Sequence, residues 1–230
     1  MQKAYSNNLL EIACFNVESC TIAQNSGANR IELCSNYALG GLTPTPDTIA
    51  KARALLEIPL HVIIRPNANS FVYTDSEINH MKQSIDVCWD KMVDGVVFGC
   101  LNPDNTIAIK QNEYLLNAAG AMNTTFHRAI DGCEDIEKNV EMVIDLGFKN
   151  ILTSGGSKQA VDGLGVIKKL QDKFSDRINI IVGGGVRSNN LDTIKEYTNC
   201  HHFHSAAITD NSEMCNAEEV ELLSDLLNNE

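Results

Sequence analysis

The sequence predicts a single (β/α)₈ barrel of the TIM type over residues 1–230. Three observations support this fold class. Eight short β-rich runs alternate with amphipathic helical segments along the whole chain, no change of composition or low-complexity linker divides it, and 230 residues is a near-typical length for such a barrel. The alternative is an open doubly wound sheet, which needs a glycine-rich loop after the first strand. The sequence reads CFNVES there, so the barrel is favoured.

The predicted strands are short runs rich in β-branched, aromatic and other apolar residues, which favour extended backbone. In chain order they are LLEIACF (9–15), NRIELC (29–34), PLHVIIR (59–65), DGVVFGC (94–100), NTTFHRA (123–129), NILTSG (150–155), INIIVGGG (178–185) and CHHFHSAA (200–207). Apolar residues at helical spacing predict helices over 18–26, 48–56, 76–89, 113–119, 135–146, 163–174, 190–197 and 217–227. Gly147, directly after the fifth of these, fits a helix C-cap.

Composition excludes several classes of function. Hydrophobic residues make up 43% of the chain and charged residues 21%, which is typical of a globular domain. The formal net charge of -12 argues against nucleic acid or an anionic membrane as a partner, since both reward basic patches. No apolar run has the length of a signal peptide core or a membrane span, so we expect a cytoplasmic protein. The eight cysteines are scattered without a CxxC pair, and most are expected to be free thiols.

Polar side chains recur near the carboxyl ends of the predicted strands, which form the active face of a barrel. Period-two alternation directs Arg30, Glu32 and Cys34 into the barrel, because their neighbours suit the helix layer. The same alternation directs Arg65 and His204 inward. Glu11 is expected to point inward as well, since a lone carboxylate against that layer would be costly. Together the predicted mouth contains Glu11, Glu32, Arg65, His127, Arg128 and His204.

These residue types suit acid–base chemistry on an anion. Two carboxyl groups on neighbouring strands, Glu11 and Glu32, are expected to raise one another's pKa, which leaves one protonated and one ionised. His127 and His204 are expected to titrate near neutrality. Arginines bind carboxylate or phosphate groups through two hydrogen bonds. The alternative is a buried salt-bridge network, although pore layers are usually branched aliphatic residues.

Glycine-rich runs follow two of the predicted strands. TSGGS follows the sixth, and Gly183, Gly184 and Gly185 end the seventh. Their backbone N–H groups can bind an anion, as in the phosphate sites of many barrels. Tight turns that need positive φ explain the same glycines equally well. Both interpretations stay open from the sequence.

Six sequence blocks resemble the copper homeostasis protein CutC family. They are RIELCSNYALGGLTPTP, HVIIRP, DGVVFG, TFHRAID, ILTSGG and GGGV through FHSAA, and the similarity extends from Glu11 to Ala207. The resemblance implies a cytoplasmic TIM-type barrel that forms homodimers or higher homo-oligomers. It also implies copper as the ligand, bound as Cu(I) by two cysteines that fall on Cys14 and Cys34. The segment Asn67–Ser70 departs from the family pattern, which commonly has an arginine there.

The sequence gives a mixed expectation for the two cysteines. Soft thiolates select Cu(I), and adjacent strands lie about 4.8 Å apart, so Cys14 and Cys34 could share a metal ion. Cys14 is out of phase with Glu11, however, and reaches the barrel mouth only if its strand ends or bulges near Ala13. Two buried thiols beneath the mouth are the alternative.

Two main hypotheses follow. The first is a cytoplasmic Cu(I)-binding protein of copper homeostasis. The second is an isomerase-like or lyase-like enzyme for a small phosphorylated or carboxylated metabolite. In the enzyme, Glu11, Glu32 or His127 moves a proton, while the anion is held by Arg65, Arg128, His204 and Gly183 to Gly185. A copper binder has no evident need of so many acids, bases and arginines. An interaction scaffold is a third, weaker hypothesis.

Overall fold

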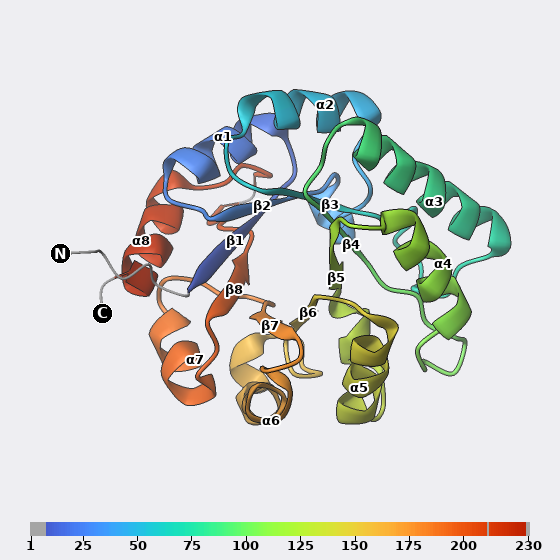
Figure 1. The fold of residues 1–230 in the computed structure, drawn as a ribbon. Helices are drawn as coiled ribbons and strands as arrows, with labels where there is room; N and C mark the ends of the chain where they lie inside the picture. The colour runs from blue at the N-terminus through green and yellow to red at the C-terminus, as the bar shows by residue number, and fades with distance from the viewer. Residues whose placement is uncertain (1–7, 211, 229–230) are drawn as a thin grey trace.

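Eight parallel strands close into a barrel in which each strand pairs with its neighbours in sequence and β8 pairs with β1. Figure 1 shows these strands at the centre of the computed structural model, with the helices arranged around them. The structure describes residues 8–210 and 212–228. The predicted (β/α)₈ fold class is confirmed.

Each strand is followed along the chain by an α-helix. The strands are β1 (Leu9–Cys14), β2 (Arg30–Leu33), β3 (Leu60–Ile63), β4 (Gly95–Phe98), β5 (Asn123–Phe126), β6 (Asn150–Thr153), β7 (Asn179–Val182) and β8 (His202–Ser205). The helices are α1 (Val17–Asn25), α2 (Pro46–Leu55), α3 (Asp75–Asp90), α4 (Ile109–Ala119), α5 (Ile136–Leu146), α6 (Leu164–Phe174), α7 (Leu191–Thr198) and α8 (Ala217–Asn228). Within the described ranges, no helix is long and apolar enough to cross a membrane.

Local sequence signals fix several helix ends. Thr74 opens α3 with a capping box, in which its hydroxyl accepts from the Glu77 N–H at 3.3 Å and Glu77 accepts from the Thr74 N–H at 2.8 Å. Asn16 caps α1 by accepting from the N–H of Ser19. Gly147 ends α5 with φ +97°, as the sequence predicts.

Several strands end before the predicted boundary. β3 ends at Ile63, β5 at Phe126 and β7 at Val182. Arg65, His127 and the glycine run Gly183 to Gly185 therefore lie in the loops that follow these strands. Polar and glycine residues turn the chain away from the sheet there, and such turns occur where strand pairing stops. Candidate site residues thus belong largely to loops held on a rigid barrel.

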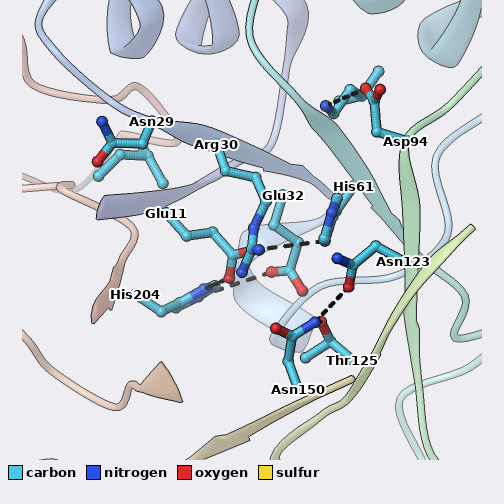
Figure 2. A network of polar contacts seen from close by, with 12 residues as sticks. Glu11, Asn29, Arg30, Glu32, His61, Asp94, Asn123, Thr125, Asn150 and His204 are labelled. Carbon is cyan, nitrogen blue, oxygen red and sulfur yellow. Dashed lines mark hydrogen bonds and ion pairs between the residues drawn. The ribbon is translucent and has the colours of Figure 1, made fainter. Parts of the chain in front are cut away.

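Side chains alternate between the helix layer and the barrel interior. Ile12, Ile31 and Val62 are fully buried in the hydrophobic core. Glu11 and Glu32, on the same strands as the first two, point to the other side, into the barrel (Figure 2). Barrel interiors are usually filled by branched aliphatic residues, so buried carboxyl groups there need specific partners.

An amide network lies at the opposite, amino-terminal end of the strands. The Asn150 amide donates to the Thr124 carbonyl at 3.1 Å and to the Thr125 hydroxyl at 3.2 Å, and its oxygen accepts from Asn179 at 3.0 Å. These amides bond to one another and to the backbone. The Asn150 side chain is thereby satisfied within the chain, unlike Glu32 and His127, which each keep a buried polar atom without a partner among the described residues.

Candidate functional site

A pocket of about 350 Å³ opens at the carboxyl ends of the strands. Its walls combine apolar side chains with charged and polar groups, as small-molecule sites do. The polar lining comprises Glu32, Cys34, Arg65, His127, Arg128, Arg187, His204 and Ser205, and Gly184 and Gly185 complete one wall. Three predicted site residues, Glu11, Cys14 and Gly183, do not line it.

Glu11 lies beneath the pocket, where both of its carboxylate oxygens are engaged. Arg30 donates from Nε to Oε2 at 2.6 Å, and His204 donates from Nδ1 to Oε1 at 2.6 Å (Figure 2). His61 Nδ1 lies 4.0 Å from Oε2. Burial alone would raise the pKa of Glu11, but the Arg30 charge and the His204 hydrogen bond hold that pKa well below its usual range. The expectation that the two carboxyl groups raise one another's pKa is wrong for Glu11, whose pKa the Arg30 charge and His204 lower. It is confirmed for Glu32, because Glu11 is among the groups that raise its pKa.

His204 connects Glu11 to the pocket. Its Nε2 lies 3.8 Å from Oε2 of Glu32, and its side chain is 13% exposed. Burial lowers the pKa of His204, but the hydrogen bond to Glu11 and the charges of Glu32 and Glu11 outweigh burial and raise it. The imidazole is thus fixed in tautomer and orientation by one carboxylate and faces a second.

Glu32 is the carboxyl group that faces the pocket. Burial raises its pKa, which His204 lowers and Glu11 raises further, with a net upward shift. The Cys34 thiol donates to Oε2 at 3.4 Å, whereas Oε1 is buried and has no hydrogen-bond partner among the described residues. A carboxyl group that keeps its proton to higher pH and has one free oxygen is suited to general acid–base catalysis.

His127 differs from His204. Its ring is 4% exposed and packs on Phe71 with centroids 4.7 Å apart. Burial and the charge of Arg65 lower its pKa to about 3. The expectation that His127 titrates near neutrality is therefore wrong, and the imidazole is neutral at physiological pH.

Two arginines at the mouth are anchored by the loops around them. Arg65 donates from Nη1 to the carbonyl oxygens of Leu39 and Gly41, both at 2.9 Å. Arg128 donates from Nε to Asp131 at 2.8 Å and from Nη2 to the Ser154 hydroxyl at 2.6 Å. Each guanidinium is therefore held in one place, and its charge faces the pocket without a large loss of side-chain entropy on binding.

Arg187 and Asp131 complete the mouth, and the sequence interpretation missed both. Arg187 follows GGGV after β7 and donates to the Val186 carbonyl at 2.7 Å and the Ser205 hydroxyl at 3.0 Å. Asp131 ion-pairs with Arg128 and accepts from the Thr153 hydroxyl at 2.6 Å. The position of Arg187 in a βα loop of a predicted barrel was a usable signal. Asp131 offered no such signal, because its partners other than Arg128 come from the end of β6 and the loop after it.

The glycines after β7 serve more than one purpose. Gly184 has φ +102° and Gly185 φ +76°, values that side chains rarely adopt. At Gly183, a Cβ would come within 2.6 Å of Leu152, so packing excludes a side chain. Within the described residues, the N–H groups of Gly184 and Gly185 donate no hydrogen bond. They therefore stay available to an anion, as in other glycine-rich turns.

The two candidate copper ligands lie in different environments. β1 runs through Cys14 without ending at Ala13, and Ala13 rather than Cys14 lines the pocket. Cys14 is fully buried in the hydrophobic core, near the thiols of Cys20 and Cys215. Cys34 is 2% exposed and lines the pocket. Burial raises the pKa of both thiols well above the usual 9.0.

The described residues contain no group of three or more His, Cys, Asp and Glu side chains placed to hold a metal ion. A Cu(I) site built on two cysteines has only two protein ligands, so it would not form such a group. Copper binding by Cys14 and Cys34 therefore stays a prediction.

The fold and the mouth define the class of protein, a (β/α)₈ barrel with a candidate ligand pocket at the carboxyl ends of its strands. Residues 8–209 match the CutC family, and the chain belongs to this family. It is 40% identical over 202 residues to a CutC family protein of Bacteroides fragilis. The matched region covers 87% of this chain and 80% of the relative. A CutC family protein of Porphyromonas gingivalis is 41% identical over 197 residues, 86% of this chain and 79% of that one.

Solved structures agree with the fold. The crystal structure of CutC from Streptococcus agalactiae, a protein named for copper homeostasis, has a TM-score of 0.83 at 32% identity and covers 86% of this chain and 98% of that one. Phosphoribosylanthranilate isomerase from Thermotoga maritima has a TM-score of 0.65 at 12% identity and covers 97% of this chain and 100% of that one. At 12% identity, the similarity to phosphoribosylanthranilate isomerase shows the barrel fold alone.

Proposed function

We propose that the protein is an enzyme that binds a small phosphorylated or carboxylated metabolite in the pocket and transfers a proton. The observation that carries this proposal is the connected series from Glu11 through His204 to Glu32, which ends at the pocket floor. A purely structural salt bridge would end with Glu11 and Arg30. Here it extends to a second carboxyl group with a free buried oxygen.

Glu32 and His204 have complementary roles in this proposal. Glu32 takes a proton from the substrate at Oε1, the oxygen that has no partner in the described part of the chain. His204 presents Nε2 to the same space, while Glu11 stabilises its protonated form through Nδ1. Glu32, whose pKa is raised by burial, then lies beside His204, whose pKa is raised by the carboxyl groups around it. Two neighbouring groups of this kind can serve as base and acid. Glu11 is a positioning residue, since it does not line the pocket.

The charge of the mouth favours an anionic ligand. The chain has a net charge of -12, yet three arginines line this one pocket. Among the described residues, only Arg128 of the three is within ion-pair distance of a carboxylate. An anion held by Arg65, Arg128, Arg187 and the N–H groups of Gly184 and Gly185 would balance the uncompensated charge.

The test begins with a screen of phosphorylated and carboxylated metabolites by thermal denaturation, followed by proton NMR of the binders in D₂O. Wild-type protein should exchange a carbon-bound proton of a bound ligand with solvent. Glu32→Gln should still bind that ligand but exchange it roughly 100-fold more slowly, because it lacks the base. Glu137→Gln, on the exposed surface of α5, is the matched control and should behave as wild type. The absence of any binder, or unchanged exchange in Glu32→Gln, would refute the proposal.

Cu(I) handling is the second candidate function. It is supported by the copper homeostasis name of the Streptococcus agalactiae relative and by the Cys34 thiol in the pocket wall. In this proposal Cys34 and Cys14 bind the ion, which requires the end of β1 to turn Cys14 inward. The predicted cytoplasmic location and homo-oligomeric state belong to both proposals.

An anaerobic Cu(I) titration against a chromogenic chelator tests the copper site. Stoichiometric binding that outcompetes the chelator, and that is lost in Cys14→Ser and Cys34→Ser, would support it. Cys133→Ser is the control, since this thiol belongs to neither candidate site and is also buried. Binding that survives both changes would exclude these two cysteines as the ligands.

A further inference from the structure

His127 lines the pocket, and among the described residues its ring carries a buried nitrogen without a partner. Its Nδ1 accepts from the Ala129 N–H at 3.4 Å, a contact that fits a neutral ring with its proton on Nε2. Within the described residues, Nε2 is buried and has no hydrogen-bond partner. Buried donors in native proteins are almost always paired. This N–H therefore lacks an acceptor that a ligand in the pocket could supply.

The imidazole is held in one orientation and kept neutral. Gly99 makes room for the ring, since a Cβ there would come within 2.9 Å of Nδ1. Phe71 packs against the ring, with centroids 4.7 Å apart. Burial and the Arg65 charge keep the pKa of His127 at about 3. A neutral ring with its proton on Nε2 donates at that atom and cannot accept a proton there.

Arg65 adds a fixed positive charge beside this donor. Its Nη1 is bound to three loop carbonyls, which hold the guanidinium against Phe71 with Cζ 5.1 Å from the ring centroid. Its charge is the one that acts most strongly on His127. A preorganised N–H donor next to a fixed cation is the arrangement that stabilises an oxygen atom on which negative charge develops.

We infer that His127 donates from Nε2 to a carbonyl or carboxylate oxygen of the substrate, which makes the substrate a carbonyl compound with an acidic C–H next to that group. The inference rests on the proposed function. Glu32 takes the proton from the carbon, the C–H electron pair forms a C=C bond, and the carbonyl π pair moves to the oxygen that His127 binds. The proton returns from Glu32 or His204 when the enolate collapses. His127 keeps its own proton throughout, so it is a hydrogen-bond donor rather than the base.

The first experiment measures the tautomer of His127 in the wild-type protein by ¹⁵N NMR. The inference requires the Nε2–H tautomer, with no protonation of this ring between pH 8 and pH 5. An Nδ1–H tautomer, or titration of His127 near pH 6.5, would overturn it. This result depends on neither turnover nor the identity of the substrate, so it separates the inference from the proposed function.

The second experiment measures binding of oxalate, a planar dianion that resembles an enolate, by calorimetry. Wild type should bind it, His127→Gln should bind within about threefold because the amide keeps a donor, and His127→Leu should bind roughly 10- to 100-fold more weakly. His80→Leu, on the exposed face of α3, is the matched control and should equal wild type. Equal binding by His127→Leu, or none by wild type, would overturn the inference. If His127→Leu does not fold, the tautomer measurement decides.

Discussion

Glu11→Gln should strongly destabilise the protein, although it changes only one atom. Arg30 Nε lies 2.6 Å from the Glu11 carboxylate, and the two side chains are 7% and 1% exposed. The substitution leaves the Arg30 charge buried without a counter-ion and weakens the hydrogen bond from His204. Breaking a buried ion pair from one side costs about 3–5 kcal/mol. We expect a loss of that size in the free energy of unfolding, measured by urea denaturation at pH 7.

An exposed ion pair provides the comparison. Glu137 pairs with Lys173 at 3.2 Å, but the two side chains are 42% and 52% exposed. Glu137→Gln should therefore change the free energy of unfolding by about 0–1 kcal/mol. If Glu11→Gln costs no more than Glu137→Gln, the buried carboxylate does not compensate Arg30, and the proposed electrostatics of the site are wrong.

The cost of Glu11→Gln should also depend on pH. The folded-state pKa of Glu11 lies well below its ordinary value of 4.5. A group with a depressed folded-state pKa contributes stability above its unfolded pKa and loses it as pH falls toward the folded value. The difference in stability between wild type and Glu11→Gln should thus be largest at neutral pH and should shrink below about pH 4.5. A difference that stays constant to pH 3 would contradict this assignment.

Two further predictions concern close packing and the anion site. Gly95→Ala should lower the free energy of unfolding by about 1–3 kcal/mol, because a Cβ there would come within 2.5 Å of His61 Nε2. The control is Gly165→Ala in α6, where a Cβ meets no atom within 4 Å, and this change should be neutral or stabilising. Thermal denaturation of both variants checks this, and equal effects would contradict it. Asp131→Asn should weaken orthophosphate binding about tenfold in calorimetry, because it frees Arg128 and the loop after β6. Unchanged affinity would show that Arg128 needs no such anchor.

The barrel was predictable because strands and helices alternate in the sequence with their own periodicities. The same period-two pattern correctly directed Glu32 and His204 into the barrel, where the two side chains lie 3.8 Å apart. The pattern could not assign hydrogen-bond or ion-pair partners, since these depend on the register between neighbouring strands. Arg30 illustrates this limit. Alternation placed it inside the barrel, but only the register of β2 against β1 brings its guanidinium to Glu11.

The pKa values of the site could not be predicted from residue types. His127 and His204 look equivalent in the sequence, yet one is neutral against Phe71 and Arg65 while the other is held between two carboxyl groups. Burial acts on both in the same direction, so the neighbouring charges decide the difference. Those charges come from distant segments, and no local pattern reports them.

The two proposed functions compete for one thiol. The Cys34 thiol donates a hydrogen bond to the Glu32 carboxyl group at 3.4 Å, and so takes part in the hydrogen bonding of the proposed base. Cu(I) binds the thiolate, which removes that donor and places a metal-bound sulfur against Glu32. A protein that used the pocket for proton transfer would therefore lose activity on binding copper at Cys34. Inhibition of ligand proton exchange by one equivalent of Cu(I), relieved in Cys34→Ser, would place both activities in the same pocket, whereas full exchange in the copper-loaded protein would separate them.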